Sequence, residues 1–296
     1  MIMNTLKKRA SDLSPFCAGL DLRPDHIPQE IAEAFETAEE RLFAYAKEAV
    51  DAAIDYAACY KVQIACYEAE GLAGLSAYAR ILKYIRGLGV PVIADIKRGD
   101  IGSTAQMYAK GHFEGDFEAD ILTLNPYMGK DAISPYFDYF RRGKGAFILG
   151  KTSNPGSVDF QDLDLLQNEG SAFSEFIRPD ILHMFSDWKL YMKVLKSILE
   201  WNGEFDEDSP MGAVIGVNEA KEIETMKKLS DRLFLLVPGY GAQGAKIEDI
   251  RSLIGSHKNG VVNVSRGYTA GIEGDFRKGL RDRAQTLAKE LRACFR

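Results

Sequence analysis

Short apolar runs alternate with longer amphipathic stretches along the whole chain. Each run is almost continuously hydrophobic and does not alternate between apolar and polar residues. This pattern is typical of strands in a parallel sheet that is covered on both faces. The eight runs are Phe16–Leu22, Ala58–Ala65, Val90–Lys97, Ala119–Asn125, Ala146–Thr152, Met211–Val217, Leu233–Val237 and Val261–Ser265.

The stretches between the runs have the spacing of amphipathic helices. Examples are Glu30–Tyr56, Gly71–Arg86, Glu219–Leu229 and Lys246–Ile254. Eight repeats of a strand followed by a helix in 296 residues favour a (β/α)8 TIM barrel over a doubly wound sheet. No stretch rich in proline, serine and glycine divides the chain, so we expect residues 1–296 to form a single domain.

One connection is much longer than the others. The segment from Ser153 to Met211 separates the fifth and sixth runs and includes the helical-looking Trp188–Trp201. We therefore expect a helical insertion after the fifth strand, at roughly residues 157–208. It would either cover the site or decorate the outside of the barrel, and the sequence leaves both alternatives open.

Composition excludes several classes of partner. The chain is 46 % hydrophobic and 27 % charged, as in an ordinary soluble globular protein. A net charge of -6 and the lack of a basic tract argue against a nucleic-acid binder. No apolar run approaches the roughly 20 residues that a membrane span needs, so we expect no membrane partner. The polar, basic start Met1–Ser14 has no hydrophobic stretch of the kind found in a secretory signal.

The four cysteines, Cys17, Cys59, Cys66 and Cys294, form no CxxC pair, and three lie in or beside apolar runs. We expect buried free thiols in a reducing cytoplasm. The four histidines are scattered, without an HExxH motif, so no zinc site is expected.

Polar residues occur where almost every predicted strand ends. In a barrel, the carboxyl ends of all eight strands open on one face, which is where active sites occur. These side chains should therefore converge on a single pocket. They are Asp21, Lys61, Asp95 with Lys97, Asn125, Ser153 with Asn154, Asn218, Gly239–Gln243 and Arg266.

The third of these strand ends carries charges of both signs. Asp95 and Lys97 are two residues apart and so point to the same side of a strand, and Asp100 follows the Arg98-Gly99 turn. Charges at the end of a buried strand are costly unless paired, which suggests a site, although a solvated loop with an ordinary ion pair is the alternative. A carboxylate beside Lys97 favours its ammonium form, which is a poor Schiff-base nucleophile and a competent general acid.

Two further loops predict a phosphorylated ligand. Pro238–Gly244 is rich in glycine and follows the seventh strand, and Arg266 ends the eighth. Phosphate sites in barrels are commonly built from these two loops, where backbone N–H groups and an arginine fork meet the phosphate oxygens. Gln243 would bond either the phosphate or the base of the ligand. The alternative is a flexible glycine turn with a surface arginine.

The spacing Asp95-x-Lys97-x-x-Asp100-Ile101-x-x-Thr104 resembles the signature of the orotidine 5'-phosphate decarboxylase family. The resemblance extends from Asp21 to Arg266, nearly the whole barrel. Ala18-Gly19-Leu20-Asp21 resembles the family's first-strand ribose-binding aspartate, Tyr60-Lys61-Val62-Gln63 its second-strand lysine, and Lys151-Thr152-Ser153-Asn154-Pro155-Gly156 the loop whose serine contacts the pyrimidine.

The last two strand ends resemble the same family. Pro238–Gly244 and Ser265-Arg266-Gly267 are similar to its phosphate-gripping loop and arginine. The Lys-Thr-Ser-Asn-Pro form, the Ser-Arg-Gly ending and the long insertion resemble the longer, type 2-like branch of bacteria and protozoa.

The resemblance implies a carboxy-lyase that converts orotidine 5'-monophosphate to uridine 5'-monophosphate and carbon dioxide, the last step of de novo pyrimidine synthesis, with no metal or organic cofactor. It implies catalysis by Lys61, Asp95, Lys97 and the partner subunit's Asp100, with Lys97 protonating C6. It also implies a cytoplasmic homodimer in which Asp100, Ile101 and Thr104 complete the partner's site. The substrate-binding residues that it implies are Asp21, Ile101, Thr104, Asn125, Ser153, Pro238, Gly239, Gln243 and Arg266.

Two other functions stay open at this point. Magnesium-dependent sugar-phosphate decarboxylases and aldolases of the same suprafamily share Asp-x-Lys-x-x-Asp but hold their metal partly through a second-strand carboxylate. Lys61 stands where that carboxylate would be, although Glu68 and Glu70 are near in sequence. A non-catalytic barrel that binds nucleotide phosphates is the other alternative, and it is disfavoured because all four charged residues are present.

Overall fold

Eight parallel strands form a closed barrel in sequence order, and β8 pairs with β1 to complete it. The computed structural model describes residues 1–165, 189–205, 209–216, 223, 226–227, 231–241, 246–255 and 257–295. Each of the eight predicted runs matches one strand, with strand ends at most one residue outside the run, so the predicted TIM barrel is confirmed. The strands are β1 (Phe16–Gly19), β2 (Cys59–Gln63), β3 (Val92–Arg98), β4 (Ile121–Leu124), β5 (Gly145–Lys151), β6 (Met211–Ile215), β7 (Leu235–Val237) and β8 (Gly260–Val264).

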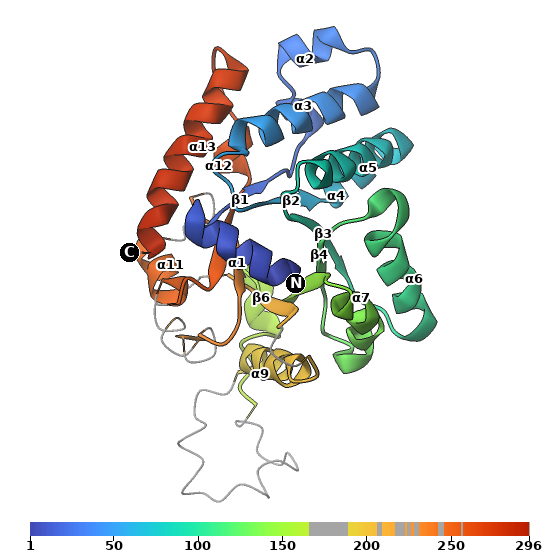
Figure 1. The fold of residues 1–296 in the computed structure, drawn as a ribbon, viewed down its shortest axis with the longest axis vertical. Coiled ribbons are helices and arrows are strands. Elements are labelled where there is room, and N and C mark those ends of the chain that lie inside the picture. Colours follow the sequence, from blue (N-terminus) through green and yellow to red (C-terminus); the bar gives the residue numbers. More distant parts are fainter. Residues whose placement is uncertain are drawn as a thin grey trace, which may run out of the picture.

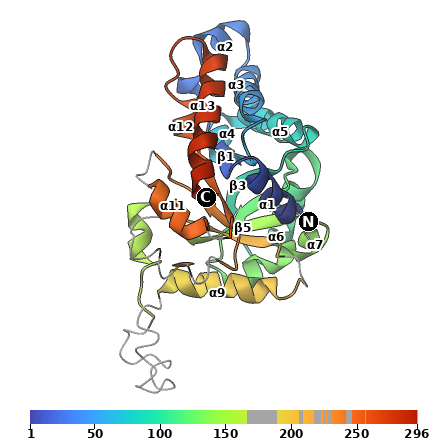
Figure 2. The same cartoon turned by 60° about the vertical axis from the view of Figure 1, so that its left-hand side comes forward.

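Helices surround the barrel, as Figures 1 and 2 show. The α-helices described are α1 (Ile2–Asp12), α2 (Gln29–Ala34), α3 (Ala38–Ala53), α4 (Ala65–Glu68), α5 (Gly71–Gly87), α6 (Gly102–Phe113), α7 (Phe137–Arg141), α9 (Leu190–Asn202), α11 (Ile247–Ile254), α12 (Arg266–Thr269) and α13 (Phe276–Arg292). Short 3-10 helices are η1 (Pro24–His26), η2 (Gly115–Phe117), η3 (Gly129–Ala132), η4 (Ser134–Tyr136), η5 (Pro155–Asp159) and η7 (Ala293–Phe295).

The helical pattern predicted over Glu30–Tyr56 corresponds to two helices, α2 and α3, and the pattern did not show the break between them. Thr37 separates them by capping α3: its side chain accepts a hydrogen bond from the Glu40 backbone N–H at 3.2 Å. The Glu40 carboxylate accepts from the Thr37 backbone N–H in return, at 3.3 Å. This capping box starts a new helix where periodicity alone predicts continuation.

One residue from each strand contributes to a layer of side chains that fills the interior of the barrel. With α1 these residues form a single buried cluster, and Figure 1 shows α1 lying across the barrel. The eight inward residues are Cys17, Cys59, Ile93, Ile121, Phe147, Val214, Leu236 and Val261. Met3, Leu6 and Ala10 of α1 pack against this cluster. Because side chains alternate along a strand, positions two residues further on also face the interior, nearer the carboxyl ends.

The long connection after β5 begins with η5 and ends with α9 before β6. The helix predicted at Trp188–Trp201 corresponds to α9, although Trp188 itself lies outside the described residues. Residues 166–188 and 206–208 also lie outside them, so the extent and role of the insertion stay predictions. Most of the helix predicted at Glu219–Leu229 lies outside as well. None of the helices in the described part of the chain is long and apolar enough to cross a membrane.

Candidate active site

A cavity of about 530 Å³ opens at the carboxyl ends of the barrel strands. Of the predicted site residues, Asp21, Lys61, Asp95, Lys97, Ser153, Pro238, Gly239 and Arg266 line it. A larger hollow of about 770 Å³ lies outside the barrel, against α2, α3 and α13. Its lining includes Glu30, Phe43 and Arg277 and no residue from the strand ends. We therefore take the smaller cavity as the candidate active site.

Four donors surround the carboxylate of Asp95 on β3. Its Oδ1 accepts from Lys97 Nζ at 2.6 Å and from Thr123 Oγ1 at 2.8 Å. Its Oδ2 accepts from Lys61 Nζ at 2.9 Å and from Gln63 Nε2 at 3.0 Å. Burial raises the pKa of Asp95, but the two ammonium groups outweigh burial and hold that pKa well below its usual range. The carboxylate is therefore ionised at neutral pH.

Lys61 lies between two carboxylates. Its Nζ is 2.9 Å from Asp21 Oδ1 and 2.9 Å from Asp95 Oδ2, and its side chain is only 5 % exposed. Burial lowers the pKa of Lys61, but Asp21 and Asp95 outweigh burial and raise it above its usual value. Lys61 is thus a fixed ammonium. A divalent cation held by Asp21 and Asp95 would have to displace it.

The backbone at Lys97 departs from a regular strand. The pairing between β3 and β4 shifts from Ala94 opposite Leu122 to Arg98 opposite Leu124, so β3 carries two extra residues there. Lys97 lies within this bulge with a φ of 45°, in the left-handed region that residues with a side chain rarely adopt. The bulge brings the Lys97 ammonium back onto Asp95, while leaving its side chain 47 % exposed toward the cavity.

Four predicted residues lie outside the cavity lined by the described residues. Asp100, Ile101 and Thr104 lie at the start of α6, where the Asp100 carboxylate accepts from the Ile101 backbone N–H at 2.8 Å. Asn125 follows β4, and its side-chain carbonyl accepts from the Tyr127 backbone N–H at 3.0 Å. Asn125 therefore closes a turn after β4 in this structure.

Two segments fix the serine after β5. Thr152 donates its backbone N–H to Gln161 Oε1 at 2.8 Å, and Gln161 Nε2 donates to Thr152 Oγ1 at 2.8 Å. Gly216 lets Ser153 lie close over the end of β6, because a Cβ at Gly216 would be 2.6 Å from the Ser153 backbone nitrogen. Ser153 and Asn154 line the cavity from this position.

The last two strands, β7 and β8, place an arginine and a glycine loop at the cavity. Arg266 directly follows the strand β8 and its neighbour Ser265, and Pro238 and Gly239 follow β7. Gly239 has a φ of 95°, which glycine adopts without strain. An arginine fork beside a glycine loop suits a phosphate. Gln243 lies outside the described residues, as does Asn218.

Sequence reasoning missed several residues that line the cavity, notably Gln63, Thr123, Asn263 and Ser265. Thr123 and Asn263 stand two positions after the inward residues Ile121 and Val261 of their own strands. The alternation of strand side chains was the signal that could have identified both. Among the described residues, no three histidine, cysteine or acidic side chains lie together as a metal-ligand group.

Comparison with known proteins agrees with this geometry. A family model described as "Orotidine 5'-phosphate decarboxylase / HUMPS family" matches residues 14–177. The orotidine 5'-phosphate decarboxylase of Clostridium botulinum is 44 % identical over 271 residues, which cover 90 % of this chain and 88 % of that protein. This chain belongs to the orotidine 5'-phosphate decarboxylase family.

Solved structures of the family agree over almost the whole chain. The orotidine-monophosphate decarboxylase structure from Toxoplasma gondii has a TM-score of 0.79 and 30 % identity, and the match covers 99 % of this chain and 96 % of that one. A Streptomyces avermitilis orotidine 5'-phosphate decarboxylase structure has a TM-score of 0.77 and 28 % identity, with 99 % and 95 % covered. The barrel is thus the fold of the family's solved structures.

Proposed function

We propose that this chain decarboxylates orotidine 5'-monophosphate to uridine 5'-monophosphate, and that Lys97 is the proton donor. The observation that carries this proposal is the row of alternating charges Asp21, Lys61, Asp95 and Lys97 at the mouth of the barrel, in which Lys61 and Asp95 are buried. Similarity to named decarboxylases over 90 % of the chain supports the reaction, and the charge array supports the mechanism.

In the proposed reaction, the bond between C6 and the carboxylate carbon breaks, and carbon dioxide leaves. The electron pair stays on C6, where the Lys97 ammonium stabilises it and then transfers a proton from Nζ. A preorganised cation is effective here because it acts where negative charge develops. Lys97 is the lysine with access, since its side chain is 47 % exposed and that of Lys61 only 5 %.

The magnesium-dependent sugar-phosphate decarboxylases and aldolases require a different residue at the end of the second strand. They hold magnesium partly through a carboxylate at the position of Lys61, whereas here that position carries an ammonium bonded to two carboxylates. Placing a second cation between Asp21 and Asp95 would be electrostatically unfavourable. The geometry therefore favours the decarboxylase that needs no metal.

The phosphate of the substrate would lie against Arg266, Pro238 and Gly239, and Gln243 would add a further hydrogen bond to it. We place the pyrimidine at Ser153 and the ribose at Asp21. Since the phosphate is remote from C6, its binding energy can be used to orient the ring and close loops over it.

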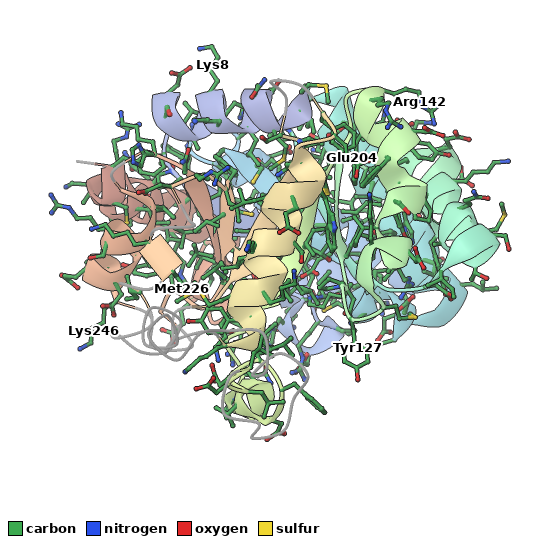
Figure 3. All side chains as sticks on the ribbon, turned by 90° about the horizontal axis from the view of Figure 1, so that it is seen from below. Lys8, Tyr127, Arg142, Glu204, Met226 and Lys246 are labelled. Carbon is green, nitrogen blue, oxygen red and sulfur yellow. The ribbon has the colours of Figure 1, made fainter. Side chains whose placement is uncertain are left out.

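We further propose a homodimer in which Asp100, Ile101 and Thr104 enter the partner's site. Asp100 follows the catalytic strand but lies outside the cavity of its own chain, as expected for a residue that acts across an interface. Exposed apolar side chains follow it along the chain: Ile101 is 50 % exposed, Met107 63 % and Tyr127, after β4, 82 %. Tyr127 points away from the body of the molecule in Figure 3. A second copy would bury such side chains.

We also propose that residues 1–296 act as one catalytic domain in the cytoplasm. The four cysteines are all free, which agrees with a reducing compartment.

The test is the loss of ultraviolet absorbance of orotidine 5'-monophosphate, with excess chelator present. We expect rapid conversion to uridine 5'-monophosphate by the wild-type chain. Lys97→Ala should abolish turnover while uridine 5'-monophosphate still binds, as measured by calorimetry. Absence of conversion, together with magnesium-dependent activity on sugar phosphates, would reject the proposed substrate. Substantial turnover by Lys97→Ala would reject Lys97 as the acid.

A further inference from the structure

The hydroxyl of Thr123 makes three hydrogen bonds at the centre of the site. It donates to Asp95 Oδ1 at 2.8 Å, and it accepts from the backbone N–H groups of Ile96 and Lys97, each at 3.0 Å. Thr123 lies on β4 and is only 1 % exposed. A hydroxyl has one donor and two acceptor lone pairs, so its capacity is used completely.

These bonds replace a missing part of the sheet. The two extra residues of β3 interrupt its ladder with β4 between Ala94 and Arg98, which is where the Ile96 and Lys97 N–H groups lie. Buried backbone donors without partners are costly. The Thr123 hydroxyl accepts from both, so it holds together the bulge in which Lys97 has its left-handed φ of 45°.

The same oxygen therefore fixes both members of one ion pair. It holds the Asp95 carboxylate through its proton and the Lys97 main chain through its lone pairs, and the Lys97 ammonium lies 2.6 Å from Asp95. We propose that Thr123 is a positioning residue that holds the proton donor Lys97 in line with the reacting carbon. This inference rests on the proposed function, because it concerns the lysine that is assigned there as the acid.

Two substitutions distinguish the effect of the Thr123 hydroxyl from that of its methyl group. Thr123→Val keeps nearly the same shape and removes all three hydrogen bonds, whereas Thr123→Ser keeps the hydroxyl. We expect Thr123→Val to lower kcat by roughly 10- to 100-fold, the effect of losing a buried hydrogen-bond partner that positions a reacting group. KM should change much less, because the phosphate and ribose contacts are untouched. Thr123→Ser should restore most of the lost kcat.

A second measurement, hydrogen–deuterium exchange at C6, reports the proton transfer without the decarboxylation. In the reverse of the protonation step, Lys97 removes the C6 proton of uridine 5'-monophosphate, so the enzyme should exchange that proton for deuterium in heavy water. NMR of the product measures this rate without any decarboxylation. Thr123→Val should slow the exchange by a factor similar to its effect on kcat. A substitution that only weakened the fold would leave the folded fraction exchanging at the normal rate.

The matched control is Thr286→Val on α13, which also removes a threonine hydroxyl bonded to the backbone, at 2.8 Å from the Asp282 carbonyl oxygen. It should leave kcat and exchange unchanged. If Thr123→Val does not yield folded protein, Thr123→Ala, which only removes atoms, replaces it in the comparison with Thr123→Ser.

The outcomes separate this inference from the proposed function. A wild-type chain without turnover of orotidine 5'-monophosphate would remove the function itself. With wild-type turnover present, normal kcat and exchange in Thr123→Val would overturn the positioning role. So would a Thr123→Ser variant as impaired as Thr123→Val, since the hydroxyl would then not be what matters.

Discussion

Replacing Asp95 with asparagine removes one negative charge and almost no volume from the centre of the site. Whichever way the new amide is oriented, its NH2 group faces an ammonium. At the Oδ2 position it would meet Lys61 and Gln63, and at the Oδ1 position it would meet Lys97 and Thr123. The substitution therefore loses two accepted hydrogen bonds and leaves a buried lysine with one carboxylate in place of two.

The size of the effect follows from burial. Asp95 and Lys61 have side chains only 7 % and 5 % exposed, and removing one partner of a buried ion pair typically costs about 3–5 kcal/mol. Lys97 is 47 % exposed, so solvent screens its part of the interaction and its share is below about 1 kcal/mol. We expect Asp95→Asn to lower the free energy of unfolding at pH 7 by about 3–5 kcal/mol.

The pH dependence has a defined sign. The pKa of Asp95 is lower in the folded chain than its ordinary value of 3.8, so its contribution is complete above that pH and is lost as the pH falls through the folded value. The pKa of Lys61 is raised above 10.5, so its contribution is complete below that pH and is lost as the pH rises through the folded value. Asp95→Asn should abolish the loss of stability at low pH that is due to this carboxylate. It should also move the loss of stability at high pH, which is due to Lys61, to a lower pH.

Urea unfolding followed by circular dichroism and repeated from acidic to alkaline pH measures the loss of stability at pH 7 and its pH dependence. The matched control is Asp12→Asn, the same substitution in the exposed pair Lys8–Asp12, whose side chains are 77 % and 56 % exposed. It should change the free energy of unfolding by less than about 0.5 kcal/mol. If Asp95→Asn were as stable as the wild type at pH 7, the charge array would be a strained arrangement and not a set of satisfied pairs. That result would refute the reasoning.

Three other predictions test the rest of the site. Mixed dimers of Lys61→Ala and Asp100→Ala chains should regain turnover through one intact site per heterodimer; no recovery in demonstrated mixed dimers would argue for a site within one chain. Arg266→Ala should weaken the binding of uridine 5'-monophosphate by roughly 10- to 150-fold, the effect of one charged hydrogen-bonding group, and should weaken the binding of uridine far less. Equal losses of affinity for the two ligands in calorimetry would contradict a phosphate role. Gln161→Leu removes both hydrogen bonds to Thr152, so KM for orotidine 5'-monophosphate should rise by roughly tenfold with the fold intact, and an unchanged KM would show that Ser153 needs no such support.

The fold could be predicted because burial on both faces leaves a strong signal in each strand. The strand β6, for example, is buried at every position, and its sequence Met211–Ile215 is correspondingly apolar. The break between α2 and α3 was harder, because the amphipathic pattern continues through it and only the Thr37 capping box ends it. Helix α1 was also missed, although Met3, Leu6 and Ala10 have the three- and four-residue spacing of a buried helix face.

The site could be predicted only in part, and the reason lies in how its residues are positioned. Lys61, Asp95 and Lys97 were recognisable because charges at the end of an apolar run are unusual. Thr123 was not, because a threonine inside an apolar strand is ordinary; its role depends on the register of β3 against β4. Nor does the sequence reveal the positive φ of Lys97, since lysine has no preference for that region. The role proposed for Asp100 depends on a second chain.

The two lysines differ in how many N–H donors remain unused, and this difference supports the roles proposed for them. An ammonium has three donors. Lys61 uses two of them on Asp21 and Asp95, and its side chain is almost fully enclosed. Among the described residues Lys97 donates to Asp95 alone, and nearly half of its side chain faces open space. Asp95 in turn has a donor at each of four positions, so it has no reason to take a proton from the substrate. A ligand entering the cavity therefore meets a carboxylate held by four donors and an ammonium with two unused donors, which supports the proposal that the proton comes from Lys97.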